Sequence, residues 1–600
     1  MKKKKLLTAL IVGTLACLAS ATLFTACGGK SSSSSELEFA LSADGTYYNV
    51  RSIGTYSKED VVIPATYKGL PVKKILPCAF AGNNITSVVI PEGVTSIGAN
   101  AFDSSSLKNI TIPDSVTTID SNIFGDFCYN LQYTEKNGLN YLGNSNNPYV
   151  YLAGVANEYA DLHIENTCKF IGYKALERNT LTKIDIPDSV TNIGDYAFLD
   201  CQNLKSITIP KSVTHIGVDA FGNSLESFGN LGNVYISNIE SWCNISFDGI
   251  ISRAFNLYVN NELVTELNIP DGITSINPYA FAGCYKLTNV NIPYSIENIG
   301  KYAFFNCKNL TSIIIPDGVK SIGKGAFLSC QNLTSIIIPD SVTQIDEKQD
   351  FNSSNLQYTI KDGAKYLGNP NNPYLYLIDA ESKDSTTVTI NDACKFISPD
   401  AFSECSNLEY SIKDGVKYLG NSNNPYIYLA AIVDKTTTSV NIENTCKFIG
   451  YNAFYGCINL QQIVIPDSIT NIGNSAFTGC TGLVNLIIPD SVRTIGDSAF
   501  ADCRSLTSIK LSNKITQINK NTFSGCSSLT EITIPDGVTE IGMFAFDSAN
   551  LRKVVIPDSV TIINSDAFIR KNYHLKIYYK AENCPIGSPT FRYIWGYTGE

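Results

Sequence analysis

Cysteine is the residue type that most suggests chemistry in this sequence, with 18 cysteines in a chain of 600 residues. Such thiols could form disulfides or bind a metal ion, but the Cys-x-x-Cys spacing typical of zinc sites is absent, so we expect no metal. Half of the cysteines follow a phenylalanine by three residues, namely Cys201, Cys284, Cys307, Cys330, Cys405, Cys457, Cys480, Cys503 and Cys526. This regular spacing predicts small, buried, apolar fillers.

Histidine offers little material for catalysis. The chain holds only His163, His215 and His574, which lie far apart in the sequence and have no nearby partner base or nucleophile. A glycine-rich phosphate loop, a zinc-protease helix motif and a nucleophile elbow are likewise absent. The sequence therefore predicts a protein that is not an enzyme and needs no cofactor.

Composition and charge limit the class of partner. Hydrophobic residues make up 44% of the chain and charged residues 17%, which excludes wholesale intrinsic disorder. The formal net charge is −10 at pH 7. Nucleic acid and anionic membrane surfaces are therefore poor partners, because both need an excess of Lys and Arg.

The amino terminus has the pattern of a targeting segment. Four lysines, Lys2 to Lys5, precede the apolar stretch from Leu6 to Phe24, which predicts a secretory signal over residues 1–26. Thr25-Ala26-Cys27 resembles the lipobox of bacterial lipoproteins, which implies a lipid on Cys27 and a Ser-rich tether over residues 27–36. The alternative is an uncleaved transmembrane anchor, since the apolar stretch is just long enough to span a bilayer.

An internal repeat accounts for most of the remaining chain. Pro270, Pro293, Pro316 and Pro339 follow one another at intervals of 23 residues. One unit contains Leu310, Ile313, Ile315, Pro316, Val319, Ile322, Gly323, Ala326, Phe327 and Cys330. A period of 20 to 29 residues with apolar positions 1, 4 and 6 is typical of leucine-rich repeats. The sequence therefore predicts a leucine-rich repeat solenoid over residues 37–569.

Each part of the unit has a structural reason. Ile313 and Ile315 lie two apart, so they point to the same, inward face of a short parallel β-strand, which Pro316 ends. We expect turns and short helical or 3-10 segments to complete each coil, with Gly323 allowing a tight bend. Stacked coils would bring successive cysteines to about 4.8 Å. Their side chains would then point in parallel, which favours reduced thiols over disulfides.

Three longer inserts near residues 130–170, 355–395 and 407–447 resemble one another. Each contains Tyr-Leu-Gly-Asn and then Asn-Pro-Tyr, as at 141–144 and 147–149, and ends in Cys-Lys-Phe-Ile. This pattern predicts a hairpin with an Asn/Pro turn. The tyrosines are either aromatic platforms for glycans or packing residues of the hairpins.

The full repeat resembles the BspA-like bacterial leucine-rich repeat proteins. The motif that carries the resemblance is Leu-x-x-Ile-x-Ile-Pro-Asp-x-Val-x-x-Ile-Gly-x-x-Ala-Phe-x-x-Cys, which occurs at 310–330 and 460–480. Residues 37–63 are similar to the amino-terminal cap of that family, and Trp595-Gly596-Tyr597 resembles the ending of its carboxy-terminal cap, here 570–600. The resemblance implies a protein on the bacterial cell surface that binds or adheres to surface proteins or glycans of a host or of other microbes.

The outward position between the two inward strand residues varies along the array and suggests where partners bind. From Asp185 to Asn291 it is polar, but it becomes apolar at Ile314 in the middle of the array. The candidate binding residues are Ile314, Ile337, Val464 and Ile487. Adjacent exposed apolar side chains would form a binding patch, whereas the alternative is β-branched filler on an exposed strand.

Together these patterns predict one elongated, right-handed solenoid of about 23 coils, a rod on the order of 110 Å long. We expect it to be a lipid-anchored surface protein that binds other macromolecules without catalysis. The alternative is a structural spacer or scaffold of the envelope that has no specific ligand.

Overall fold

The structure is a computed structural model. It describes residues 36–568 and 576–579, apart from gaps at 43, 105, 121, 126–127, 158–161, 223–230, 252–253, 347–354, 558, 561 and 565. The predicted signal peptide, Cys27 and nearly all of the tether lie outside the described residues, as does most of the predicted carboxy-terminal cap. The described residues form a solenoid of about 21 turns with a spacing of about 23 residues, which confirms the predicted leucine-rich repeat fold.

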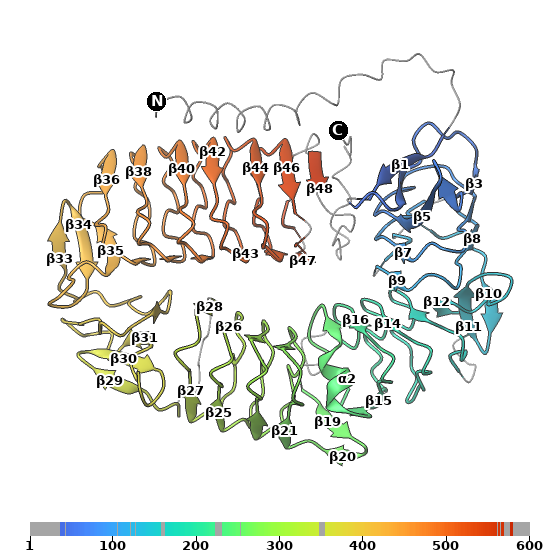
Figure 1. Cartoon of the computed structure of the whole chain (residues 1–600), viewed down its shortest axis with the longest axis horizontal. Coiled ribbons are helices and arrows are strands. Elements are labelled where there is room, and N and C mark those ends of the chain that lie inside the picture. The colour runs from blue at the N-terminus through green and yellow to red at the C-terminus, as the bar shows by residue number, and fades with distance from the viewer. Residues whose placement is uncertain are drawn as a thin grey trace, which may run out of the picture.

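Each coil contributes strands to two parallel rows on opposite sides of the solenoid (Figure 1). The outer row contains β3 (Asp60–Val62), β6 (Ser87–Val89), β8 (Asn109–Thr111), β15 (Ser206–Thr208), β17 (Asn233–Ile236), β19 (Asn256–Val259), β21 (Glu266–Asn268), β23 (Asn289–Asn291), β25 (Ser312–Ile314), β27 (Ser335–Ile337), β36 (Ser439–Asn441), β38 (Gln462–Val464), β40 (Asn485–Ile487), β42 (Ser508–Lys510), β44 (Glu531–Thr533), β46 (Lys553–Ile556) and β48 (Lys576–Tyr579). The strands pair with the next coil in register, so that Ile313 lies opposite Ile336.

The second row lies on the inside of the curve that the array follows, and we call it the inner row. It contains β5 (Leu70–Ile75), β7 (Ser96–Ile97), β9 (Thr118–Ile119), β13 (Phe170–Ile171), β14 (Asn192–Ile193), β16 (His215–Ile216), β18 (Ser246–Phe247), β22 (Ser275–Ile276), β24 (Asn298–Ile299), β26 (Ser321–Ile322), β28 (Gln344–Ile345), β32 (Phe396–Ile397), β37 (Phe448–Ile449), β39 (Asn471–Ile472), β41 (Thr494–Ile495), β43 (Gln517–Ile518), β45 (Glu540–Ile541) and β47 (Ile562–Ile563). Antiparallel additions are β1 (Glu38–Leu41) against β2 (Tyr48–Ser52), β4 (Thr66–Tyr67) against β5, and β20 (Glu262–Leu263) against β19.

The side of the coil between the inner strand and the next outer strand consists of turns. Short helical segments were expected in the coils, but the described residues of this side form none, and α2 (Ile239–Cys243) lies on the other side, between the outer strand β17 and the inner strand β18. Tyr302 and Asn306 have φ angles of 52° and 59°, and this left-handed backbone interrupts a helix. Alternate N–H groups instead donate to the next coil, as Phe304 does to the Ala326 carbonyl at 2.8 Å. Backbone hydrogen bonds therefore join the coils on this side as well.

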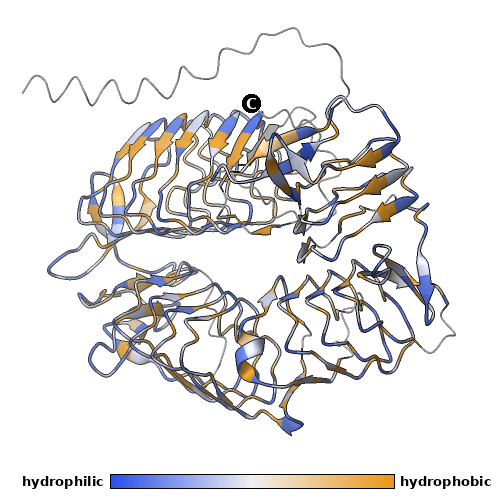
Figure 2. Ribbon diagram, turned by 45° about the vertical axis from the view of Figure 1, so that its right-hand side comes forward, coloured by the Kyte–Doolittle hydropathy of each residue, from blue (hydrophilic) through white to orange (hydrophobic). Residues whose placement is uncertain are grey.

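Stacked phenylalanines fill the interior beside these turns. Phe477, Phe500 and Phe523 follow one another at ring-centroid distances of 5.2 and 5.6 Å with nearly parallel planes. All three side chains are buried. Figure 2 shows apolar residues concentrated along the strands and hydrophilic residues in the connecting loops. One coil cannot bury its own apolar side, so stacking supplies the core.

The repeated glycine after the inner strand is required by close approach of the coils. A Cβ atom added to Gly323 would lie 2.5 Å from the Lys301 nitrogen and 2.8 Å from the Gly300 carbonyl carbon, both on the preceding coil. Gly323 is not among the glycines with positive φ, so the tight-bend interpretation of this residue was incomplete. Neighbouring coils pack backbone against backbone here, and a side chain would push them apart.

We therefore expect Gly323→Ala to destabilise the array by about 1–3 kcal/mol, because the methyl group meets backbone that cannot move aside. Gly154→Ala is the matched control, since its added Cβ would come no closer than 4.0 Å to the Ala175 carbonyl oxygen. Urea denaturation of both variants checks the prediction. Equal midpoints for the two variants would show that the coils have room to separate.

The three inserts form antiparallel meanders. Their strands are β10 (Thr134–Lys136), β11 (Leu139–Leu142) and β12 (Tyr151–Val155), then β29 (Thr359–Lys361), β30 (Ala364–Leu367) and β31 (Tyr376–Ala380), then β33 (Ser411–Lys413), β34 (Val416–Leu419) and β35 (Tyr428–Ile432). Two-residue turns with positive φ at both positions, such as Asn137-Gly138, join the first two strands of each insert. The Asn/Pro segment joins the second strand to the third.

The array is curved into a ring-like shape, so the predicted straight rod is wrong (Figure 1). The meanders stand at the corners and divide the array into arm 1 (residues 37–131), arm 2 (162–345) and arm 3 (439–568). The outer row is interrupted at the inserts. Each meander also breaks the inner row on its amino-terminal side, whereas its last strand pairs in parallel with the next inner strand, as β12 does with β13. The inserts also use more chain than a standard unit, which explains why about 21 turns form where 23 were expected.

Candidate binding surface

The outer row presents the last residue of its three-residue strands to solvent around the outside of the ring. In β25, Ile313 is buried while Ile314 is 63% exposed, as the two-residue period of a strand requires. Val464 and Ile487 in arm 3 are 79% and 66% exposed. The structure thus places three of the four candidate binding residues on open surface.

Ile337 is the exception, because its side chain is only partly exposed. It lies in β27, the last outer strand before the second insert. The backbone N–H of the next residue, Ile338, donates to the Gly368 carbonyl of that insert at 3.0 Å. The insert therefore flanks Ile337, and the patch that it forms with its in-register neighbour Ile314 is smaller than the sequence suggested.

The four candidates form two separate patches. Ile314 and Ile337 lie in arm 2, whereas Val464 and Ile487 lie on successive coils of arm 3. The coils of the arm 3 pair carry two further exposed apolar residues, Ile458 and Val484, which the sequence analysis missed. These two residues flank the strands, so the alternation that reveals outward positions within a strand does not apply to them. Together Ile458, Val464, Val484 and Ile487 make up what we call the arm 3 patch.

One tyrosine of each Tyr-Leu-Gly-Asn motif packs within the fold. Tyr141, Tyr366 and Tyr418 occupy equivalent positions and are fully buried. The Tyr141 hydroxyl accepts a hydrogen bond from the Glu165 N–H at 3.1 Å, and Tyr366 and Tyr418 receive the same contact from Asn391 and Glu443. These rings support the packing interpretation, because buried rings offer no platform to a glycan.

The nine cysteines that follow a phenylalanine by three residues, which we call the cysteine ladder, are buried, and their thiols are free. Cys330, Cys480 and Cys526 each donate a hydrogen bond at 3.2 Å to the carbonyl of the phenylalanine that opens the turn of the preceding coil. Burial raises the pKa of each of these three thiols to about 12. Each thiol therefore adds a second hydrogen bond to a carbonyl that already accepts from a backbone N–H, as the Phe304 carbonyl does from Cys307, and it stays protonated at neutral pH.

These shifts predict a loss of stability at alkaline pH. The folded chain holds the thiol proton up to about pH 12, whereas the unfolded chain releases it near the ordinary pKa of 9.0. Because the unfolded state then binds fewer protons, the stabilisation is present below about pH 9 and declines as the pH rises towards 12. Denaturation midpoints between pH 8 and 11 check this, with Cys480→Ala expected to show a weaker decline.

The same packing predicts that the ladder cysteines are reduced. Intact mass after alkylation without reductant should show most ladder cysteines labelled once the chain is unfolded, whereas disulfide-bridged pairs would contradict the packing.

His215 takes part in a contact between neighbouring coils. Its Nε2 lies 3.2 Å from an Asp248 carboxylate oxygen; His215 is the first residue of β16, and Asp248 follows β18 on the neighbouring coil. Burial alone lowers the pKa of His215, but the hydrogen bond and charge of Asp248 outweigh burial and hold it above its ordinary value. Within the part of the chain that the structure describes, no three His, Cys, Asp or Glu side chains are grouped to hold a metal ion.

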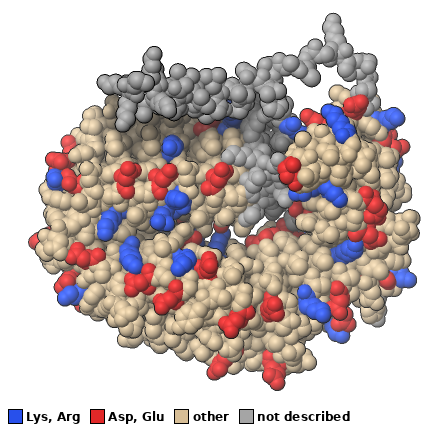
Figure 3. All heavy atoms as spheres, in the orientation of Figure 1, with Lys and Arg blue, Asp and Glu red and all other residues tan. Residues whose placement is uncertain are grey.

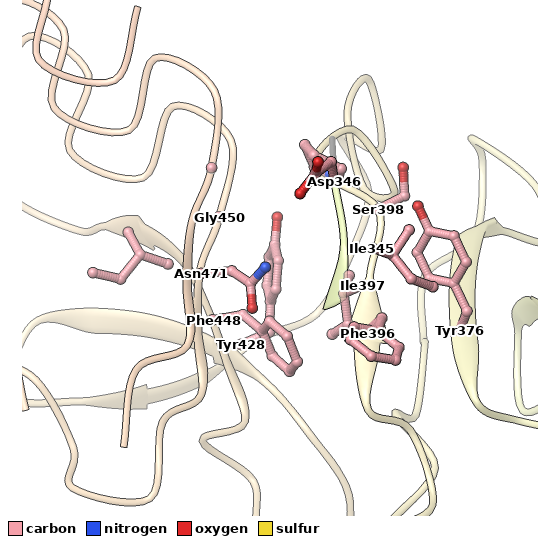
Figure 4. Close-up of a pocket in the computed structure, with 13 residues that line it drawn as sticks. Ile345, Asp346, Tyr376, Phe396, Ile397, Ser398, Tyr428, Phe448, Gly450 and Asn471 are labelled. Atoms are coloured by element: carbon pink, nitrogen blue, oxygen red, sulfur yellow. The ribbon is translucent and has the colours of Figure 1, made fainter. Parts of the chain in front are cut away.

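A small cavity lies at the corner between arms 2 and 3 (Figure 4). Ile345, Phe396, Tyr428 and Phe448 contribute to its walls, and Asp346 lies at its edge. Its volume is about 20 Å³, which is room for one water molecule. The cavity is therefore a packing defect of the corner and is too small for an organic ligand.

Charges on the face shown in Figure 3 are mixed, with Lys and Arg interspersed among Asp and Glu. This face carries no continuous block of either sign. Among the residues that the structure describes, no helix is both long enough and apolar enough to cross a membrane.

These features define a repeat protein in which stacked coils form the core and one row of strands faces solvent around the outside. The chain belongs to the BspA-type leucine-rich repeat family, whose model matches residues 59–146, 156–252, 250–369, 380–446 and 447–574. The resemblance that the 310–330 unit suggested is confirmed. No curated protein matches the chain.

Solved structures of similar fold include proteins from several bacteria. A leucine-rich cell surface protein from Faecalibacterium prausnitzii A2-165 is 21% identical and covers 93% of this chain and 96% of its own, with a TM-score of 0.21. A leucine-rich repeat protein from Bacteroides ovatus ATCC 8483 is also 21% identical and covers 90% of this chain and 100% of its own, with a TM-score of 0.20.

Proposed function

We propose that this protein is a lipid-anchored protein of the bacterial cell surface that binds other macromolecules through the outer row and has no catalytic activity. The observation that carries the proposal is the exposure of Val464 and Ile487 on successive coils. Membership of a repeat family whose conserved positions build a core is consistent with a role for the variable outward positions in recognition. Host or microbial surface proteins and glycans are the partners that we expect.

The arm 3 patch suits a partner with an apolar surface. Each Å² of apolar area covered by a partner contributes about 25 cal/mol, so a few such side chains supply several kcal/mol of gross attraction. Part of that attraction is lost to association entropy, which leaves a modest affinity that repeated contacts can multiply.

An array of extracellular matrix proteins and glycans tests the proposal. We expect the purified protein to be retained by at least one component and to elute without chemical change of that component. Retention by none would favour the alternative role of an envelope spacer or scaffold.

A further inference from the structure

Arms 2 and 3 touch each other through their inner rows, although the contacting residues lie far apart in the sequence. Lys301, just after β24, donates to both carboxylate oxygens of Glu540 in β45 at 2.6 and 2.7 Å. Lys324, just after β26, lies 3.5 Å from an Asp497 carboxylate oxygen. Both lysines belong to arm 2 and both acids to arm 3, so the two surfaces are complementary in charge.

Polar side chains extend this contact towards the corner. Gln344 donates to the Thr516 hydroxyl at 3.1 Å, and Gln517 donates to the Asp346 carboxylate at 3.3 Å. The contact runs in opposite directions along the two arms, because Lys301 meets Glu540 whereas Gln344, later in arm 2, meets Thr516, earlier in arm 3. Lys324 lies between these two contacts and reaches both Asn519 and Asp497. The arms therefore lie antiparallel and close on each other from the corner outwards.

The contact joins two separate hydrophobic cores. The buried apolar cluster that includes arm 2 runs from Leu139 to Tyr376, and the cluster of arm 3 runs from Val416 to Phe568. Among the described residues neither cluster contains a member of the other arm. A third cluster, from Ala364 to Phe448, fills the corner with residues of the second and third inserts. Separating the arms therefore exposes no shared apolar core.

The Lys301–Glu540 pair is the strongest part of the contact and the part most sensitive to loss of a partner. Its side chains are 15% and 12% exposed, and the Lys301 ammonium also lies 5.8 and 5.7 Å from the ring centroids of Tyr279 and Tyr302. A buried charge that loses its partner is strongly disfavoured, because it is neither hydrated nor neutralised. Opening of the arms relieves this by returning the charge to water.

We propose that the inner-row contact of arms 2 and 3 is a releasable clasp, and that the chain exchanges between the closed ring and an open form hinged at the corner. Each arm keeps its own core in both forms. The open form exposes the inner rows of both arms to solvent.

Carbodiimide crosslinking of the full chain tests the clasp directly. This reagent joins an amine to a carboxylate with loss of water and adds no spacer, so it reports the contact of Lys301 with Glu540. We expect mass spectrometry to find this crosslink at low salt, and its yield to fall at about 1 M salt, where screening acts within about 3 Å. Absence of the crosslink at low salt, or a yield that salt leaves unchanged, would overturn the proposal.

Charge reversal provides the second test. Lys301→Glu with Lys324→Glu should increase the radius of gyration in X-ray scattering at unchanged strand content, whereas Lys301→Glu with Glu540→Lys should restore the compact value. Lys183→Glu is the matched control, because its ion pair with Asp185 is exposed and lies within one arm. An unchanged radius in the double reversal overturns the clasp. If that variant is unfolded, the swapped pair decides: a compact swapped pair supports the clasp and an expanded one contradicts it.

Discussion

Phe500→Ala is expected to lower the stability of arm 3 by about 3–5 kcal/mol, the usual cost of removing a buried aromatic ring. Phe500 is fully buried and stacks on Phe477 and Phe523, so its loss opens a cavity between two coils. The rings on either side cannot close the gap, because backbone hydrogen bonds hold the coils at their spacing. Denaturation by urea measures the effect.

Hydrogen exchange should confine this loss to arm 3, because the cores of arms 2 and 3 are separate clusters. Tyr294→Ala is the matched control: this aromatic side chain is mostly exposed, and we expect a change within about 0.5 kcal/mol. A loss below about 1 kcal/mol for Phe500→Ala, or equal losses of protection in arms 2 and 3, would contradict a core built from stacked rings.

Cys27→Ser is expected to abolish anchoring to the membrane. The small residues Thr25 and Ala26 precede this cysteine and a Ser-rich tether follows it, so its thiol is the proposed site of the lipid. Without the lipid, the protein is either released or left with its signal peptide uncut. Detergent phase partitioning and the mass of the amino-terminal peptide measure both outcomes.

Cys17→Ser is the control for this variant, because Cys17 lies within the apolar stretch of the predicted signal. It should leave processing and partitioning unchanged. If the Cys27 variant also partitions into detergent and is processed like the natural chain, the anchor is not a lipid on Cys27, and an uncleaved membrane anchor becomes the better interpretation.

The local structure of each coil could be predicted because the same pattern of packed residues recurs in many repeats. Ile313 and Ile315 face inward, Pro316 lies beyond the end of β25, and Phe327 fills the opposite wall. The turn side was predicted less well, because one of its left-handed positions is occupied by residues such as Tyr302 and Phe544, which carry no clear sequence signal, although the other is often Asn, Asp or Gly, as at Asn306. The role of Gly323 required the distance between coils, which one unit cannot show.

The ring shape could not be predicted, because it depends on residues that are distant in sequence. The inserts were visible in the sequence as departures from the 23-residue period. Their effect on the direction of the array depends on where the meanders interrupt the rows of strands. Contacts such as that of Lys301 with Glu540 join residues 239 positions apart. Within the repeat pattern, both residues occupy positions where a polar side chain is ordinary, so the sequence contains no sign of the contact.

The candidate surface was predicted in part. The period of two placed Ile314, Val464 and Ile487 outward, and the structure has them exposed. The partial cover over Ile337 comes from the neighbouring insert, and the added exposure of Ile458 and Val484 lies outside the strands. Both effects depend on the three-dimensional arrangement of coils, which the alternation pattern does not contain.

The most direct test of the outer row as a binding surface is the variant Val464→Asp with Ile487→Asp on the matrix-protein and glycan array. We expect its affinity for the retained component to fall at least about tenfold, which corresponds to about 1.4 kcal/mol, at a stability within about 0.5 kcal/mol of the natural chain. Thr533→Asp, an exposed position of the same row, should leave binding unchanged. Unchanged affinity in a folded double variant would contradict the account, because the arm 3 patch would then be filler.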